Sequence, residues 1–310
     1  MSSRIDRPRL EGSVAVLNAR RLSFAEYGVP RGNAVIWMHG TPGARRQIPF
    51  EARAYAHEND IRIIGIDRPG IGSSTPHLYD NVYEWTADLE RLMEVLAIDK
   101  AHIIGLSGGG PYALAAGAAF PDRIHGVGVI GGVAPTIGVD AIRGGVVELA
   151  PYAAPILSLA RVPLGVVLAQ AIRVVRPAAG RFLDAYAAVQ PTGDKALLAR
   201  PEFRAMFLDD LLNGSRFQMS APLSDIILFT RHWGFEAADV EVPVHWWHGD
   251  ADHIIPFRHG EHMAERLPSV KFTEIKGESH LGGLGLATEI LKKTLVLGPR
   301  PAKKSAKKST

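Results

Sequence analysis

The sequence predicts an α/β protein in which a mostly parallel sheet is flanked by helices and interrupted by a helical insertion. Short apolar strands alternate with helices through residues 1–133, which is typical of a parallel sheet covered on both faces. Strand patterns are absent from residues 134–236, where prolines separate apolar helical segments. The alternation returns in residues 237–298, and a basic segment, 299–310, follows. We therefore expect one core in two parts, a helical insertion and a tail.

Before the insertion, most predicted strands are compact apolar runs bounded by glycine, proline or asparagine, a pattern of strands that are buried on both faces. Apolar residues recur every three or four positions between residues 82 and 96, which predicts an amphipathic helix. The expected strands are 13–17, 20–27, 34–38, 61–66, 103–106 and 124–130, and the expected helices are 47–58, 82–96 and 111–119.

The insertion contains one stretch, Ala153 to Ile172, that is almost wholly apolar and is interrupted by Arg161 and Pro163. The favoured interpretation is a buried helix-turn-helix. An apolar wall for a substrate and a surface in contact with lipid are the alternatives. After the insertion we expect strands at 242–247 and 270–275 and helices at 257–267 and 284–297.

Composition excludes several classes of protein. The net charge of the 310-residue chain is +3, and four lysines lie in residues 302–310. The remainder is close to neutral, so the basic character indicates a solvated, disordered tail and not a nucleic-acid partner. There is no cysteine, hence no disulfide or thiolate nucleophile. Without an apolar leader or a continuous apolar run of spanning length, we expect a cytoplasmic protein with no integral membrane segment.

A glycine-flanked serine lies between a predicted strand and a predicted helix. Gly105-Leu106-Ser107-Gly108-Gly109 satisfies the G-x-S-x-G pattern, in which the turn is so tight that side chains at the flanking positions would clash. The helix that follows places its partial positive charge beneath the serine, where it favours an oxyanion. By itself the pattern is equally compatible with a flexible glycine loop.

Functional groups gather outside the carboxyl ends of the strands in such sheets, and here four loops follow strand ends. They are His39-Gly40-Thr41-Pro42-Gly43, the Ser107 turn, Gly249-Asp250-Ala251-Asp252 and Gly277-Glu278-Ser279-His280. Serine needs a base, and His280 follows the final predicted strand. A carboxylate would hold that imidazole in one tautomer. Serine, then acid, then histidine is the order of this chemistry in one fold family.

From about Ser13 to Leu297 the chain resembles the α/β-hydrolase superfamily, in particular serine hydrolases with a His-Gly-x-Pro oxyanion loop and a helical cap. The resemblance implies that Ser107 is the nucleophile and His280 the base. The family spacing from Gly249 selects Asp252 over Asp250 as the acid. The resemblance also places the two donors of the oxyanion hole at the backbone N–H groups of Thr41 and Gly108.

Other residues receive structural roles in this interpretation. Many relatives carry a bulkier residue at position 108, so its glycine predicts a wider pocket floor. Arg68 is expected to be a loop scaffold. No cofactor or metal is expected, because the histidine spacings fit no common zinc motif and Gly70-Ile71-Gly72 lacks a dinucleotide fingerprint. The histidines concerned are His245, His248, His253, His259 and His262.

The predicted function is hydrolysis of a carboxylic ester or related acyl compound, with a small-molecule, apolar acyl substrate as the partner. Alternatives on the same fold are a carbon–carbon bond hydrolase, a cofactor-free haloperoxidase and an aminopeptidase similar to proline iminopeptidase. The aminopeptidase is disfavoured because five arginines, but only Asp140 and Glu148 as acids, lie between Asp140 and Arg181. A non-catalytic receptor is disfavoured because all three triad residue types are present. The sequence does not indicate an oligomeric state.

Overall fold

The structure is a computed structural model that describes residues 7–298 of the chain. Within these residues eight strands form one sheet in the order β1-β2-β4-β3-β5-β6-β7-β8. The β1–β2 and β2–β4 pairs are antiparallel and the other pairs are parallel, so the predicted mostly parallel sheet is confirmed. The strands are β1 (Leu10–Ala15), β2 (Arg21–Gly28), β3 (Asn33–Met38), β4 (Ile61–Ile66), β5 (Ala101–Leu106), β6 (Ile124–Ile130), β7 (Val244–Gly249) and β8 (Val270–Ile275).

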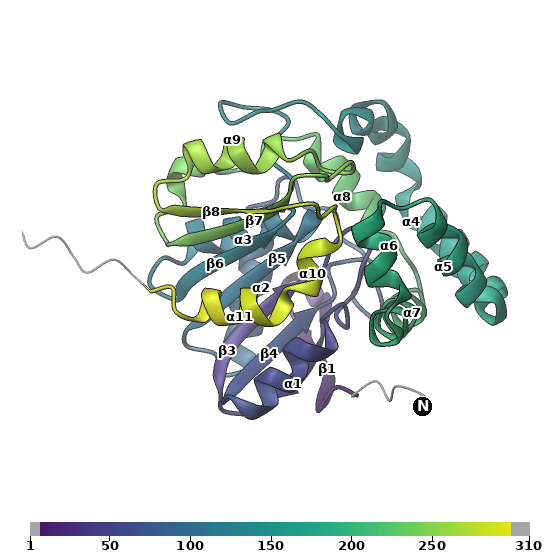
Figure 1. Cartoon of the computed structure of the whole chain (residues 1–310), viewed down its shortest axis with the longest axis horizontal. Coiled ribbons are helices and arrows are strands. Elements are labelled where there is room, and N and C mark those ends of the chain that lie inside the picture. Colours follow the sequence, from purple (N-terminus) through teal and green to yellow (C-terminus); the bar gives the residue numbers. More distant parts are fainter. Residues whose placement is uncertain (1–6, 299–310) are drawn as a thin grey trace, which may run out of the picture.

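Helices cover both faces of the sheet (Figure 1). Alternate side chains of each strand enter opposite faces. Val35 and Trp37 pack on the face that α1 and α11 cover, whereas Ile36 and Met38 pack on the face of α2, α3 and α9. These helices are α1 (Phe50–Glu58), α2 (Trp85–Val95), α3 (Gly110–Ala119), α9 (Arg258–Arg266), α10 (Gly282–Gly285) and α11 (Ala287–Leu295).

Five further helices lie between β6 and β7 in the chain and occupy the right-hand side of Figure 1, beyond one end of the strands. We call them the inserted helices. They are α4 (Ala150–Val175), α5 (Ala179–Ala188), α6 (Thr192–Ala199), α7 (Pro201–Gly214) and α8 (Ala221–Phe229). The chain described between β6 and β7 contains no β-strand, as expected for residues 134–236.

Several boundaries differ from the prediction: β1 and β7 are shifted by two or three residues, and α2 begins at Trp85 and not at residue 82. The helix expected from residue 47 begins at Phe50, because the Gln47 side chain accepts a hydrogen bond from Gly40 N–H and Pro49 follows in the loop. The helix expected at 284–297 is divided into α10 and α11 at Leu286. The predicted basic tail, 299–310, lies outside the described residues.

The favoured interpretation of Ala153 to Ile172 as a buried helix-turn-helix is wrong. The stretch belongs to α4, one continuous helix that contains Pro155 and Pro163 and buries only three residues, Ala150, Gly165 and Ala169. These small residues let one side of α4 pack closely against its neighbour, and most of its larger apolar side chains remain exposed to solvent.

The helical segment Val146–Ala188 is long and apolar enough to cross a bilayer by length and composition alone. The expectation of no integral membrane segment therefore stays a prediction.

Candidate active site

The serine turn has the strained geometry that its sequence indicates. Ser107 has a φ of 51° and lies between β5 and α3. A Cβ on Gly105 would lie 2.4 Å from the Gly109 carbonyl oxygen, and one on Gly109 would lie 2.5 Å from that of Met38. Real Cβ atoms do not approach so closely, so both flanking glycines are required. The turn is a built strand-to-helix elbow and not a flexible loop.

The structure brings Ser107, His280 and Asp252 together. His280 Nε2 lies 2.9 Å from Ser107 Oγ, and His280 Nδ1 lies 2.7 Å from Asp252 Oδ2. With the Nδ1 proton donated to the carboxylate, Nε2 is free to accept the hydroxyl proton. All three side chains are buried, with exposures of 7%, 8% and 7% respectively. The arrangement can activate an alcohol as a nucleophile.

Asp252 is held in its ionised form by its neighbours. Its Oδ1 accepts hydrogen bonds from the backbone N–H groups of Ile254 and Ile255, both at 2.9 Å. Burial would raise the pKa of Asp252, but hydrogen bonds from His248 and His280 outweigh it and lower that pKa below its ordinary value. Asp250, the competing candidate, is turned elsewhere and accepts a hydrogen bond from Gly277 N–H at 2.7 Å.

His248 is a supporting residue that the sequence analysis did not identify. Its Nδ1 accepts the indole N–H of Trp246 at 3.2 Å, which leaves the proton on Nε2. That Nε2 lies 2.8 Å from the Ile255 carbonyl oxygen and 3.4 Å from Asp252 Oδ2. The fully buried imidazole therefore contacts the back of the carboxylate. The sequence signal that could have indicated this role is the position of His248, four residues before Asp252.

The loop after β3 is held by a buried arginine. Arg68 donates to the carbonyl oxygens of His39 and Gly40, at 2.5 and 2.9 Å, in agreement with its predicted role as a scaffold. Gly40 N–H donates to Gln47 Oε1 at 2.7 Å. Burial, and secondly the charge of Arg68, lower the pKa of His39 well below its ordinary value. A neutral His39 can donate from Nδ1 to the Gly40 carbonyl oxygen, 2.8 Å away.

Thr41 and Gly108, the predicted oxyanion donors, are adjacent. A Cβ on Gly108 would lie 2.3 Å from Thr41 Oγ1. The expectation of a wider floor beside the serine is therefore wrong, because the threonine side chain fills the space that glycine leaves. Thr41 and Ser107 line the cavity described below.

A carboxylate from the inserted helices joins this loop. Asp225 on α8 is 1% exposed and accepts hydrogen bonds from Arg68 at 2.7 Å, from the Thr41 hydroxyl at 2.5 Å and from the Tyr112 hydroxyl at 2.7 Å. The sequence analysis did not identify Asp225. The available signal was a single carboxylate in the otherwise apolar helix Ala221–Phe229.

A cavity of 410 Å³ opens above Ser107 and His280. Its wall is mostly apolar, and most of its large apolar side chains come from the inserted helices, including Ile172, Val175, Phe182, Leu183, Tyr186, Phe207 and Leu211. Asp210 on α7 is a carboxylate in this wall. It accepts hydrogen bonds from Ala44 N–H and Arg46 N–H at 2.9 and 3.1 Å. Burial, and secondly the charge of Asp67, raise the pKa of Asp210 to about 7.

Three more of the histidines considered as metal ligands, His245, His259 and His262, bond protein groups. His245 contacts Thr273, His259 contacts the backbone of Ala134 and Gly144, and His262 contacts the Asp140 carbonyl oxygen. Across residues 7–298, no three His, Cys, Asp or Glu side chains are grouped to hold a metal ion.

Curated relatives match part of the chain. Proline iminopeptidase from Neisseria meningitidis is 33% identical over 126 residues, which cover 40% of each protein. Proline iminopeptidase from Xanthomonas citri is 36% identical over 111 residues, 35% of each. The chain thus spans about 40% of the length of these relatives.

Solved structures match nearly the whole fold. An esterase, RhEst1, from Rhodococcus sp. ECU1013 superimposes with a TM-score of 0.65 at 19% identity, over 93% of this chain and 99% of that one. A bromoperoxidase from Bacillus anthracis gives 0.64 at 21% identity, and an enol-lactonase from Burkholderia xenovorans LB400 gives 0.66 at 20%, each over 92% of this chain and 99% of the other. A family model described as alpha/beta hydrolase fold matches residues 33–284. This match, on a sheet whose serine elbow meets a histidine and an aspartate, shows that the chain belongs to the α/β-hydrolase family.

Proposed function

We propose that the protein is a serine hydrolase that cleaves carboxylic esters with an apolar acyl group. The observation that carries this proposal is the position of His280, within hydrogen-bonding distance of both Ser107 and Asp252 at the floor of an apolar cavity. A largely apolar wall, in which Asp210 is the one carboxylate, suits an acyl chain. We further propose that the inserted helices act as a cap, because they supply about half of that wall and most of its large apolar side chains.

The reaction would proceed through an acyl-enzyme. Ser107 Oγ attacks the ester carbonyl while its proton passes to His280 Nε2, and Asp252 stabilises the resulting imidazolium. The backbone N–H groups of Thr41 and Gly108 would hold the oxyanion. Collapse of this intermediate expels the alcohol, which takes the proton from His280. Water then gives a proton to His280 and attacks the acyl carbon, which releases the carboxylic acid and restores Ser107.

Nitrophenyl esters from acetyl to palmitoyl, assayed beside matched amides, test this proposal. We expect ester hydrolysis and covalent labelling by a fluorophosphonate, both of which Ser107→Ala should abolish. Ser73→Ala, at an exposed serine outside the cavity, is the matched control and should behave as wild type. Labelling that persists in Ser107→Ala, or failure of the wild type to hydrolyse any ester of the series, would refute the assignment.

An aminopeptidase is the second candidate, favoured by the names of the curated relatives and by Asp210. The excess of arginines that disfavours it lies in residues 140–181, whereas the cavity carboxylate comes from α7, further along the chain. An ionised Asp210 could pair with a substrate ammonium group. Hydrolysis of L-proline p-nitroanilide discriminates between the candidates. If the protein is an aminopeptidase, kcat/KM for this anilide should exceed kcat/KM for every ester of the series. Asp210→Asn should then lower the activity on the anilide and leave the activity on the esters unchanged.

A further inference from the structure

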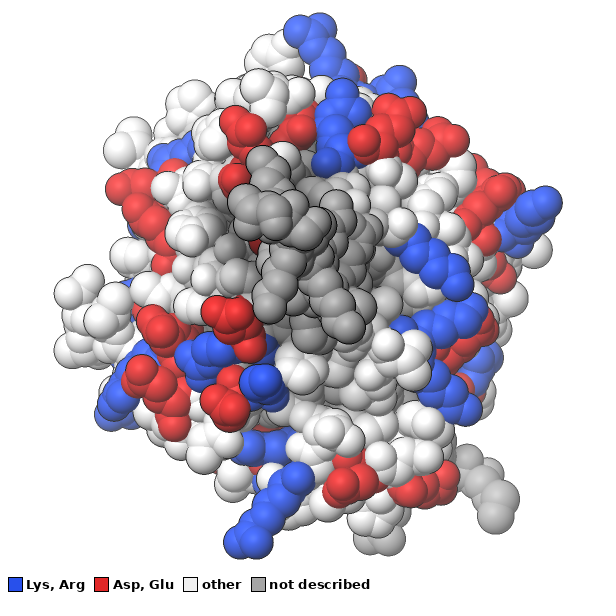
Figure 2. Space-filling view, turned by 90° about the vertical axis from the view of Figure 1, so that its left-hand side faces the viewer, with Lys and Arg blue, Asp and Glu red and all other residues white. Residues whose placement is uncertain are grey.

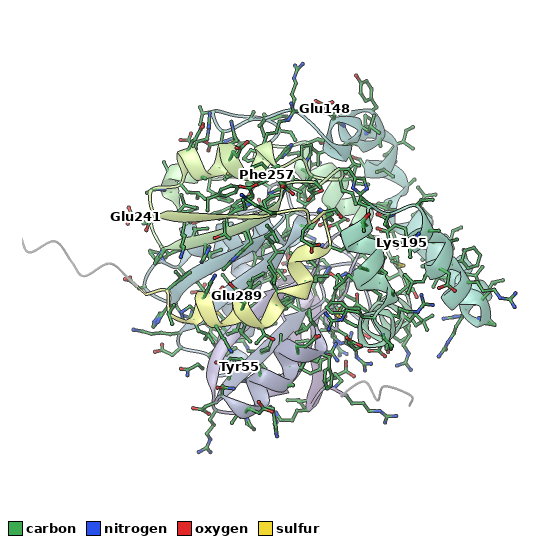
Figure 3. All side chains as sticks on the ribbon, in the orientation of Figure 1. Tyr55, Glu148, Lys195, Glu241, Phe257 and Glu289 are labelled. Carbon is green, nitrogen blue, oxygen red and sulfur yellow. The ribbon has the colours of Figure 1, made fainter. Side chains whose placement is uncertain are left out.

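The outer face of α4 and α5 consists of large apolar side chains that the protein leaves in solvent, and we propose that this face docks on an anionic lipid surface. We call it the apolar face. Figure 3 shows side chains projecting from these two helices at the right-hand edge of the molecule. The face is formed by Tyr152 (82% exposed), Ile156 (68%), Leu159 (90%), Val167 (64%), Val174 (78%) and Phe182 (58%).

The spacing of these residues makes one continuous stripe. The α4 members follow one another at intervals of four, three, eight and seven residues, which keeps them on one side of a helix. The opposite side is packed against protein: a Cβ on Gly165 would lie 2.6 Å from Ser220 N, and the Gly165 carbonyl oxygen accepts Met219 N–H at 3.0 Å. The helix is thus held with its apolar stripe outward. A patch of this kind marks a site of interaction.

The charge of the residues near the apolar face indicates an anionic partner. No acidic residue lies between Glu148 and Asp184, while that stretch contains Arg161, Arg173, Arg176 and Arg181. Elsewhere the surface mixes both signs, as the face in Figure 2 shows. Of the four arginines, Arg173, Arg176 and Arg181 are exposed, and exposed arginines beside an apolar stripe suit anionic headgroups over acyl chains. A second copy of the chain is the poorer fit, since a symmetric pair would bring the same arginines together without an opposing carboxylate.

The helix would lie on the bilayer and not cross it. Gly165 and Ala169 are buried against protein, and Ile172 and Val175 line the cavity, so only one side of α4 can meet lipid. Arg161, near the middle of the apolar stretch, would be costly at a bilayer centre.

The apolar face adjoins the cavity. Phe182 belongs to both, and Ile172, Val175 and Tyr186 line the cavity from the same two helices. If the proposed esterase function holds, an apolar ester dissolved in the bilayer could reach Ser107 along a continuous apolar path. Docking itself does not depend on that function.

Co-sedimentation of the full-length chain with vesicles tests the proposal. We expect binding to phosphatidylcholine vesicles that contain phosphatidylglycerol and much weaker binding to phosphatidylcholine alone. Ile156→Ser combined with Leu159→Ser should weaken binding about tenfold or more. Neither residue lines the cavity. The matched control is Leu17→Ser with Val296→Ser, two exposed apolar residues outside the inserted helices. Far-UV circular dichroism and thermal melting verify the fold of each variant.

A second pair of variants tests the charge. Arg176→Gln with Arg181→Gln should weaken binding to the anionic vesicles about tenfold, whereas Lys100→Gln with Lys276→Gln removes the same charge elsewhere and should have little effect. The tail lysines are present in every variant, so their contribution cancels. Ser107→Ala should bind as wild type does, which separates docking from catalysis.

Three outcomes would overturn the proposal. The first is no binding to either vesicle, and the second is equal binding by the Ile156/Leu159 and Leu17/Val296 double variants. The third is a lipid-free dimer in sedimentation velocity that the Ile156/Leu159 variant loses, because the apolar face would then be an interface between copies.

Discussion

The guanidinium of Arg68 lies 2.7 Å from the carboxylate of Asp225, although 157 positions separate them in the chain. Both side chains are almost fully buried, at 2% and 1% exposure. Through this pair the inserted helix α8 holds the loop that carries Thr41, since Arg68 also binds the carbonyl oxygens of His39 and Gly40. The inserted helices therefore contribute to the position of the loop after β3 as well as to the cavity wall.

Asp225→Ala should destabilise the protein and slow catalysis. It leaves Arg68 as an uncompensated buried charge, which costs about 3 kcal/mol or more, and it removes the acceptor of the Thr41 hydroxyl. We expect a loss of that size in the free energy of unfolding by urea, and a kcat for nitrophenyl acetate that falls more than KM rises. Glu94→Ala breaks an exposed pair with Arg91 and should cost less than about 1 kcal/mol. Equal effects of the two changes would contradict this account.

The elbow should not accept a side chain at position 105. In Gly105→Ala the new methyl would meet the Gly109 carbonyl oxygen at 2.4 Å, and neither backbone can move without displacing Ser107. We expect a loss of about 2 kcal/mol or more of stability, together with most of the hydrolytic activity. In Gly180→Ala the methyl meets nothing within 4 Å, so helix propensity should leave stability unchanged or raise it by about 0.5–1 kcal/mol. Normal activity in Gly105→Ala would show that the elbow geometry is not required.

Two neighbouring aspartates should differ sharply in their contribution to rate. Asp252→Asn loses the charge that stabilises the His280 imidazolium and favours the wrong tautomer, so kcat should fall by about four orders of magnitude. Asp250→Asn affects only an exposed contact to Gly277 N–H and should change kcat by less than about threefold. Ester hydrolysis by the two purified variants measures both. A larger loss in Asp250→Asn would reassign the acid.

Stability should depend on pH through Asp210. Its pKa is raised from 3.8 to about 7 in the folded protein, so the folded state binds this proton more tightly than the unfolded state does. The associated stability is present below the unfolded pKa and is lost as pH rises towards the folded pKa. Asp210→Asn cannot titrate, so its free energy of unfolding relative to wild type should improve between about pH 5 and about pH 8.

Urea unfolding at both pH values measures this trend. Asp209→Asn removes a neighbouring carboxylate that pairs with Arg46 but keeps the Asp210 carboxyl, and should retain the wild-type dependence. A constant difference between Asp210→Asn and wild type at the two pH values would show that Asp210 does not titrate there.

Much of the molecule was predictable because its signals are local. The apolar runs at 34–38, 61–66 and 124–130 became β3, β4 and β6, since a strand buried on both faces admits few polar residues. Ser107 and His280 follow the ends of β5 and β8, and the family spacing selected Asp252 after β7. Their meeting was predictable because parallel strands present their carboxyl ends at one edge.

Other features depended on contacts between distant segments. No local sequence pattern indicates that Asp225, the single carboxylate of α8, pairs with Arg68. Asp210 lines the cavity only because α7 packs over the loop after β3. The space beside Gly108 is filled by Thr41, which no property of position 108 indicates. The exposure of α4 was likewise misjudged, because an apolar stretch has the same sequence whether protein covers it or not.

The sequence by itself thus determined the α/β architecture, the strained serine elbow and the identity of the three residues that meet above it, because backbone sterics and strand burial act over a few residues. Only the tertiary structure decided which carboxylates support the oxyanion loop and the cavity, and which side of α4 remains in solvent, because those outcomes depend on which surfaces pack together across the folded chain.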